Sequence, residues 1–239
     1  MNNLFDIHSH ILPGVDDGSS CVEESTLLID LEYEQGVRNL VLTPHYRPEM
    51  FEVSPEDRLD AYENLVSTVK SIHPDMNLYL GCEVYLNKKT ADCFANSANR
   101  MLGLSVVLVE FNYGVTFTAM VELLRKVQDQ GYSIIIAHVE RYDCLRENIN
   151  NISILKSMGC YLQVNCDAVI GKNGLMTRLY VDKLFRKGSV DFVASDAHDI
   201  KSRTVHFEKA CRLVEKKYGS DMAQAVFKNN AEALFGKKG

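Results

Sequence analysis

Short runs of apolar, often β-branched residues alternate with longer amphipathic segments along the whole chain. Several short runs are apolar at consecutive positions, which is typical of strands that are covered on both faces of a sheet. The longer segments have the polar and apolar spacing of surface helices. The apolar runs span residues 3–8, 37–43, 77–84, 105–111, 132–138, 160–165 and 190–195.

The amphipathic segments lie between these runs and after the last one. The clearest helical segments span residues 23–36, 54–72, 117–131, 151–159, 175–188, 202–219 and 221–236. This repeated order of strand and helix predicts an α/β fold around parallel strands. No glycine-rich nucleotide-binding loop follows the first run, which disfavours an open doubly wound sheet. We therefore predict a distorted seven-stranded (β/α)7 TIM-like barrel, with residues 1–239 forming a single domain.

Composition narrows the range of functions. The chain has 239 residues, of which 46% are hydrophobic, and this is enough for one sizeable core. Its formal net charge of -6, without clustered Lys and Arg, argues against a nucleic-acid partner. The 7 cysteines form no C-x-x-C pair and are expected to be reduced thiols. The sequence contains no long apolar run or signal-peptide pattern, so we expect a cytoplasmic protein without membrane insertion.

Histidines and carboxylates stand where the predicted strands end. The carboxyl ends of parallel strands share one face of a barrel, so residues far apart in the sequence should converge there. His8 and His10 are two residues apart on the first strand, and their side chains should point the same way towards one ion. The other candidates at strand ends are His45, Glu83, His138, Asp196 and His198, and the loop after the first strand contains Asp16 and Asp17.

This set of imidazoles and carboxylates predicts a metal centre. It requires no cysteine and suits manganese, iron or zinc in a reactive site rather than a structural zinc. The candidates outnumber the ligands of one ion, and Glu83 and Asp196 could bridge adjacent ions, so we predict two or three ions. Either aspartate of the first loop could be a ligand; Asp17 is favoured, and Asp16 reads as a helix cap or turn residue. His73 and His206 are expected to be structural, with His206 inside a helix.

The order of these motifs resembles the PHP (polymerase and histidinol phosphatase) superfamily of metal-dependent phosphoesterases. The segments DIHSHILPGVDDG, LTPH, GCEVY, IIAHVERYD, QVN and VASDAHD, followed by SRTVHF, look most similar to one group within it. That group is the bacterial protein-tyrosine phosphatases of capsular and exopolysaccharide gene clusters. The resemblance covers nearly the whole chain.

The resemblance implies a distorted seven-stranded barrel with a trinuclear, usually manganese, centre. It also implies that Arg141 and Arg203 bind the phosphate, beside Asp196 and His198 in the catalytic site. The loop after His45 matches the family only loosely, so Tyr46 and Arg47 are left unassigned. The implied metal ligands are His8, His10, Asp17, His45, Glu83, His138, Asp196 and His198.

These residues support hydrolysis of a phosphomonoester. A metal-bridging hydroxide is the expected nucleophile, because bound metal lowers the pKa of water from 15.7 towards about 7. Arg141 and Arg203 would offer forked donors to the phosphoryl oxygens. Asp199 or His198 could protonate the leaving group, and the sequence does not decide between them. No cysteine is followed by five residues and an arginine, so a thiol-phosphate mechanism lacks its motif.

The function predicted from these features is an enzyme, a metal-dependent protein-tyrosine phosphatase. The resemblance implies that its partner is a phosphotyrosine protein, namely a bacterial tyrosine autokinase that regulates capsular or exopolysaccharide synthesis. Three alternatives stay open at this point. The first is a small-molecule phosphatase, such as one for histidinol phosphate. The others are a catalytically silent, metal-stabilised interaction module and an amidohydrolase that deacetylates a sugar.

Overall fold

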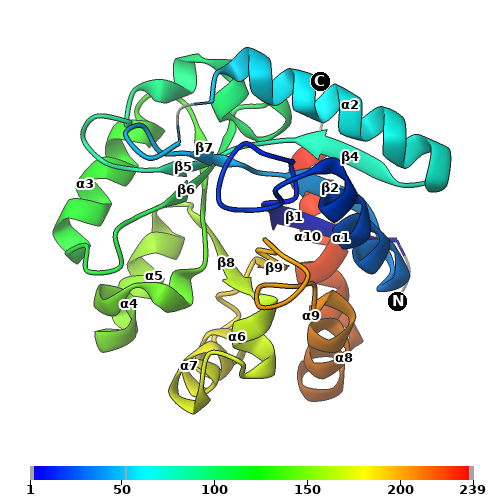
Figure 1. Ribbon diagram of the computed structural model, residues 1–239. Helices are drawn as coiled ribbons and strands as arrows, with labels where there is room; N and C mark the ends of the chain where they lie inside the picture. Colours follow the sequence, from blue (N-terminus) through cyan, green and yellow to red (C-terminus); the bar gives the residue numbers. More distant parts are fainter. Residues whose placement is uncertain (1–2, 52, 237–239) are drawn as a thin grey trace.

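The computed structural model describes residues 3–51 and 53–236. Parallel strands lie in the middle of the molecule, and helices surround them (Figure 1). The strands are β1 (Leu4–Ser9), β2 (Val37–Leu42), β3 (His45–Tyr46), β4 (Asn77–Leu80), β5 (Glu83–Tyr85), β6 (Val106–Glu110), β7 (Ser133–Ile136), β8 (Tyr161–Asn165) and β9 (Phe192–Ala194). The α-helices are α1 (Val22–Glu34), α2 (Pro55–Ile72), α3 (Phe117–Gln128), α4 (Asp143–Glu147), α5 (Asn150–Ser157), α6 (Cys166–Ile170), α7 (Leu175–Arg186), α8 (Phe207–Tyr218), α9 (Ser220–Gln224) and α10 (Asn230–Phe235).

Several shorter helical turns complete the chain. The 3-10 turns span Cys93–Ala95, Ser97–Asn99, Met101–Gly103 and Val139–Arg141, and a π-helical turn (Ala225–Asn229) joins α9 to α10. Within the described residues, no helix has both the length and the apolar character that crossing a bilayer requires.

The strands form two parallel sheets in the described part of the chain. One sheet has the order β1-β2-β4, and the other has the order β3-β5-β6-β7-β8-β9. The first and last strands also approach each other, because Ser9 and Ala197 form an isolated parallel bridge. Next to this bridge, the His10 amide donates to the Ala197 carbonyl at 2.8 Å. The α/β class with parallel strands is confirmed, whereas a closed ring of seven strands stays a prediction.

One predicted strand is interrupted, and one short strand lies outside the predicted runs. The run 77–84 divides into β4 and β5, and β3 follows the predicted strand 37–43 after Pro44. Proline has no amide to donate to a strand ladder. A Cβ atom on Gly81 would lie only 2.9 Å from Val41 Cγ1, so this tight passage between β4 and β5 requires glycine. Beyond the interruptions, β3 and β5 pair with His45 directly opposite Glu83, which brings two candidate ligands side by side.

Apolar side chains cover both faces of the strands. An inner cluster takes alternate residues of β1, β6, β7 and β9, such as Phe5 and Ile7, as the twofold periodicity of a strand requires. Helix α10 packs against this cluster, with the Phe235 ring centroid 5.7 Å from that of Phe5. An outer cluster joins the opposite faces to the surrounding helices. The buried histidines and carboxylates of the candidate site lie at the carboxyl ends of the strands and in the loops that follow.

The predicted helical segments are confirmed, with one correction in the segment 202–219. Helix α8 begins only at Phe207, and His206 is its N-cap residue rather than a residue inside the helix. The preceding stretch is a loop because the Asp199 carboxylate accepts hydrogen bonds from the amides of Lys201 and Ser202, both at 2.6 Å. Such local side-chain bonds compete with helix formation.

Candidate metal centre

The candidate ligands converge at the carboxyl ends of the strands, as the sequence predicts. Two of them, Asp17 and His45, are partly accessible, and the others are buried. Seven of them, together with Glu110, form three overlapping groups in which the ligand atoms lie within 4.8 Å of one another, and among the described residues His138 belongs to none of these groups. The groups are His8, His10 and Asp196; His10, Asp17, His45 and His198; and His45, Glu83 and Glu110.

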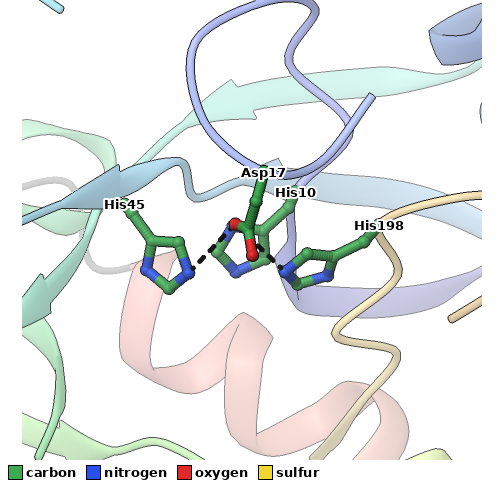
Figure 2. A group of neighbouring side chains, drawn as sticks. All are labelled: His10, Asp17, His45 and His198. Atoms are coloured by element: carbon green, nitrogen blue, oxygen red, sulfur yellow. Dashed lines mark ion pairs between the residues drawn. The ribbon is translucent and has the colours of Figure 1, made fainter. Parts of the chain in front are cut away.

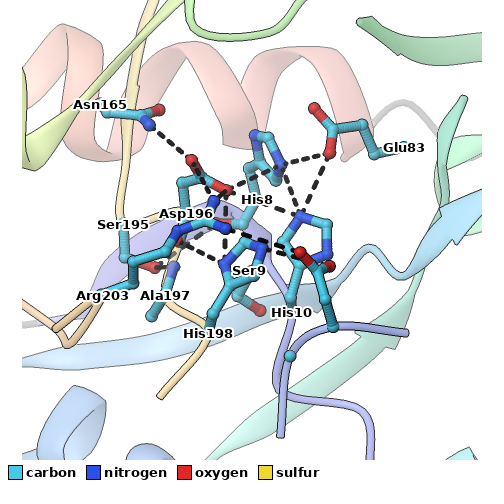
Figure 3. Close-up of polar contacts among 12 residues, drawn as sticks. His8, Ser9, His10, Glu83, Asn165, Ser195, Asp196, Ala197, His198 and Arg203 are labelled. Carbon is cyan, nitrogen blue, oxygen red and sulfur yellow. Dashed lines mark hydrogen bonds and ion pairs between the residues drawn. The ribbon is translucent and has the colours of Figure 1, made fainter. Parts of the chain in front are cut away.

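Glu83 occupies the centre of this arrangement. Its Oε2 atom lies 3.3 Å from His8 Nε2, 3.2 Å from His10 Nε2 and 3.1 Å from His45 Nδ1. Its other oxygen, Oε1, lies 2.9 Å from His138 Nε2. Figure 3 shows this carboxylate facing the rings of His8 and His10. One fully buried carboxylate therefore connects four histidines, which is the position of a bridging ligand.

The rings of His8 and His10 are oriented by bonds behind them. His8 Nδ1 donates to Gln163 Oε1 at 3.1 Å, and the same oxygen accepts the His138 amide at 2.8 Å. His10 Nδ1 donates to Asp16 Oδ2 at 2.7 Å. A neutral imidazole that donates from Nδ1 keeps its lone pair on Nε2. The two Nε2 atoms lie 3.2 Å apart. When both rings are neutral, two lone pairs therefore face each other, and a cation between or beside them would stabilise this arrangement.

The first loop places its two aspartates differently. The Asp16 side chain is fully buried, and besides His10 it accepts the amides of Gly18 and His45 at 3.0 and 2.9 Å. The Asp17 side chain is 47% exposed and lies 3.5 Å from His45 and 3.7 Å from His198. Figure 2 shows Asp17 between these two rings, with His10 beside them. Asp17 thus faces the cluster, and Asp16 supports it from behind.

The loop is held in this position by a close approach to β1. A Cβ atom on Gly18 would lie 2.0 Å from the His10 carbonyl oxygen, so a larger residue would displace the loop. The neighbouring Ser19 amide donates to that carbonyl at 3.0 Å. Only glycine at this turn allows the two aspartates to lie next to the histidines.

Glu110 is a member of the cluster that the sequence analysis missed. It ends β6, and its oxygens lie 3.5 Å from His45 Nδ1 and 3.8 Å from His138 Nε2. Burial and the neighbouring charge of Glu83 raise the pKa of Glu110 to about 9. The signal was present, because Glu110 ends the predicted strand 105–111 in the same way that other candidates end theirs.

Arg141 and Arg203 both reach Asp196. Arg141 Nη2 lies 2.7 Å and Arg203 Nη2 lies 3.1 Å from Asp196 Oδ2. The side-chain NH₂ group of Asn165 donates to the same oxygen at 2.6 Å (Figure 3). Although burial opposes ionisation, Arg141, His8 and Arg203 hold the pKa of Asp196 well below its ordinary value. The two guanidinium groups therefore stand at the edge of the histidine and carboxylate cluster, as the resemblance implies.

Two members of the site have strained backbone conformations. His138 has φ 32° and Asp196 has φ 52°, in the left-handed region that favours glycine. Non-glycine residues in this region cost about 1–3 kcal/mol each and concentrate at functional sites. Their conformations direct the two side chains into the cluster at the ends of β7 and β9.

The unpaired atoms of the site fit a metal cation. Four buried atoms of the cluster form no hydrogen bond despite their close neighbours: His45 Nδ1, Glu83 Oε2, Glu110 Oε1 and His198 Nε2. Unpaired buried acceptors cost free energy that a bound cation would recover. Burial and the charge of His10 lower the pKa of His198 to about 2, so its Nε2 is available as a lone-pair donor. The chemistry of these atoms is that of ligands to ions such as manganese, iron or zinc.

The site opens into a cavity of about 340 Å³. Its floor contains Glu83, Glu110, His138 and Asp196, and Asp17 and His45 also line it. Arg47, Tyr113, Arg141 and Arg203 complete the lining. Arg47, which the sequence left unassigned, therefore reaches the site. A cavity of this size with two paired arginines beside a metal-type cluster suits a phosphorylated group.

Two further candidates take structural roles. The Asp199 carboxylate accepts hydrogen bonds from its own loop. Burial raises the pKa of Asp199, but these hydrogen bonds outweigh burial and lower the pKa to about 2. An acid of that strength would be ionised at neutral pH, which disfavours it as the proton donor. His73 bonds to Asp30 at 2.6 Å and stacks on Tyr33, in agreement with the structural role predicted for it.

The fold and the site together define an α/β protein with a buried histidine and carboxylate centre suited to metal ions. Residues 4–236 match the family described as "Capsular polysaccharide synthesis, CpsB/CapC". The chain belongs to the CpsB/CapC family. This membership confirms the resemblance drawn from the motifs at the strand ends.

Individual proteins agree with this membership. The chain is 31% identical over 237 residues to "Tyrosine-protein phosphatase CpsB" of Streptococcus pneumoniae, covering 97% of this chain and 98% of that protein. It matches, with a TM-score of 0.89 and 26% identity, a structure described as "Crystal structures of YwqE from Bacillus subtilis and CpsB from Streptococcus pneumoniae, unique metal-dependent tyrosine phosphatases". That match covers 97% of this chain and 94% of the other.

A more distant structure shares the fold alone. Histidinol phosphate phosphatase from Lactococcus lactis matches with a TM-score of 0.54 and 16% identity, over 90% of this chain and 94% of that chain.

Proposed function

We propose that this chain is a metal-dependent phosphatase that hydrolyses phosphotyrosine on a protein substrate. The observation that carries the proposal is the position of Arg141 and Arg203, which meet on Asp196 at the edge of three overlapping ligand groups. A phosphate bound there would contact metal ions on one side and two forked cations on the other. The names of the CpsB and YwqE relatives support the same activity.

We assign the ions to the three overlapping groups and propose two or three manganese ions, with iron or zinc as alternatives. The ligands would be the eight residues predicted from the sequence, joined by Glu110. When bound, the ions supply Lewis acidity, which activates a water for attack on phosphorus and offsets the charge of the phosphoryl oxygens.

The residues of the chain hold and orient the reacting groups. Asp16 and Gln163 fix the rings of His10 and His8, so that their Nε2 atoms face the cluster. Arg141 and Arg203 each use an Nη2 atom on Asp196 and keep further N–H donors for phosphoryl oxygens. The leaving group of phosphotyrosine is a phenolate with a pKa near 10, which needs less acid assistance than an alkoxide. A leaving group that needs little acid assistance suits this site, because the Asp199 carboxyl in the nearby loop is ionised at neutral pH.

The physiological part of the proposal is taken from the family resemblance. The substrate would be a bacterial tyrosine autokinase that regulates capsular or exopolysaccharide synthesis, and the reaction would take place in the cytoplasm. We also propose that residues 1–239 act as one domain and that the two sheets behave as a distorted seven-stranded barrel. The bridge between Ser9 and Ala197 and the shared inner core support this arrangement.

The test is the hydrolysis of a phosphotyrosine peptide by metal-stripped protein, with and without added manganese. A phosphoserine peptide and histidinol phosphate serve as comparison substrates. We expect manganese to restore phosphotyrosine turnover, and Asp196→Ala to abolish it. His73→Ala is the matched control, because this histidine bonds to Asp30 rather than to the cluster.

Each other outcome assigns a different function. Restored turnover of histidinol phosphate alone would keep the metal site and replace the protein substrate with a small molecule. A protein that binds manganese and folds, yet hydrolyses no phosphomonoester, would act as an interaction module. Either result would refute the proposed activity.

A further inference from the structure

A second cavity adjoins the metal centre. It has a volume of about 170 Å³, and its lining residues are Arg47, Tyr85, Glu110, Phe111, Asn112 and Tyr113. Three of these, Arg47, Glu110 and Tyr113, also line the cavity above the metal centre. The two cavities therefore share a wall.

Arg47 is a preorganised cation at this shared wall. Its guanidinium carbon lies 4.2 Å from the centroid of the Tyr85 ring, in a cation–π contact. Among the residues that the structure describes, none forms a hydrogen bond or ion pair with the Arg47 guanidinium. Stacking holds the plane of an arginine but leaves its N–H donors at the edge for a ligand.

Two further donors in the second cavity also lack protein partners in the described residues. Asn112 Oδ1 accepts the Gly114 amide at 3.0 Å, which leaves the Asn112 NH₂ group for a ligand. The hydroxyl of Tyr113 is likewise without a described protein partner, and this residue is 51% exposed. Glu110 is the one carboxylate in the lining, and its oxygens face His45 and His138. The second cavity thus offers donors and one cation to an acceptor group.

We propose that the second cavity binds the carboxylate side chain of an Asp or Glu residue that flanks the phosphotyrosine of the substrate. This inference rests on the proposed function, since it assumes that the phosphotyrosine occupies the first cavity. Adjacent Cα atoms of a peptide are about 3.8 Å apart, so a flanking residue can reach across a shared wall. A carboxylate also matches the forked donors of an arginine.

The test compares two phosphotyrosine peptides that differ only in the flanking residue, Glu in one and Gln in the other. The flanking residue is tried on each side of the phosphotyrosine in turn. With manganese-loaded protein, we expect kcat/KM for one acidic peptide to exceed that of its neutral partner by about tenfold, the effect of one charge-assisted hydrogen bond. In the Arg47→Gln variant this ratio should fall to about one.

Arg212→Gln is the matched control, because Arg212 is exposed on α8 and pairs with Glu208. This variant should keep the native ratio. A native ratio near one, or a ratio that Arg47→Gln leaves unchanged, would overturn the inference while phosphotyrosine turnover itself still supported the phosphatase. Absence of turnover on every phosphotyrosine peptide would instead overturn the proposed function, and the second cavity's role would fall with it.

Discussion

Replacing Asp16 with Asn tests how the chain prepares its histidines for metal. In the native protein, Asp16 Oδ2 accepts a hydrogen bond from His10 Nδ1 at 2.7 Å and another from the His45 amide at 2.9 Å. An asparagine has one acceptor oxygen and would place a donor NH₂ group near one or both of these N–H groups. His10 could relieve the conflict by moving its proton to Nε2. That change would remove the lone pair that faces the cluster.

The size of the effect follows from the lost bond. A hydrogen bond to a buried charged group contributes about 1.5–3 kcal/mol. Loss of an outer partner of a metal ligand typically lowers metal affinity about 10–100-fold, which corresponds to about 1.4–2.8 kcal/mol. The two estimates agree, so we expect Asp16→Asn to weaken manganese binding by about 10–100-fold without removing a ligand atom.

The assay is a manganese titration of the metal-stripped protein, together with ¹⁵N chemical shifts of the His10 ring in the metal-free state. Asp30→Asn is the control, because Asp30 bonds to His73 at 2.6 Å in a similar aspartate and histidine pair elsewhere in the fold. That variant should retain native affinity. The reasoning is refuted if Asp16→Asn binds manganese within about twofold of the native protein, or if its His10 ring keeps the native tautomer while affinity falls.

Three further substitutions probe other parts of the molecule. Glu110→Gln keeps the side-chain shape but replaces a carboxyl that can release its proton to a metal ion with an amide that cannot ionise, and it should lower manganese affinity by more than about tenfold in the same titration. Arg141→Ala should retain its metal, measured by elemental analysis, but lose on the order of 10²-fold to 10³-fold in kcat; loss of the metal would contradict its role at phosphate. Burial and the nearby charge of Asp6 raise the pKa of Glu32 well above its ordinary value, so folding favours the protonated carboxyl. Native stability should therefore fall as pH rises from about 4.3, the ordinary pKa of glutamate, up to that folded-state pKa. Over this range Glu32→Gln should gain in melting temperature relative to the native protein; an advantage independent of pH would oppose this account.

Much of the fold could be read from the sequence because the strands are buried on both faces. Continuous apolar runs such as 132–138 mark such strands, and their carboxyl ends locate the ligands. The short strand β3 and the division of the run 77–84 were not predicted, and the passage at Gly81 depends on close packing against Val41 rather than on local pattern. The late start of α8 was missed for a different reason, since local hydrogen bonds to the Asp199 carboxylate hold the residues that follow it as a loop.

The site was predicted less completely than the fold. Motifs of closely spaced histidines and aspartates identify ligands, whereas the only signal for Glu110 was its place at a strand end, and this signal was overlooked. The different roles of Asp17, which faces the cluster, and Asp16, which supports His10 from behind, also depend on the path of the loop. Gly18 fixes this path by its close approach to His10. Supporting residues such as Gln163 act through distant partners, 155 positions from His8. Such partnerships become visible only in three dimensions.

The sharing of ligands has a consequence for how the centre fills. His10 and His45 each belong to two of the three ligand groups, and Glu83 Oε2 approaches both. A neutral imidazole has one lone pair and holds one ion, whereas a carboxylate can be shared, so an ion that bound first would orient the Glu83 carboxylate for the next ion. Occupancy should therefore rise cooperatively with metal concentration, and the protein should change between nearly empty and nearly full over a narrow range of supply.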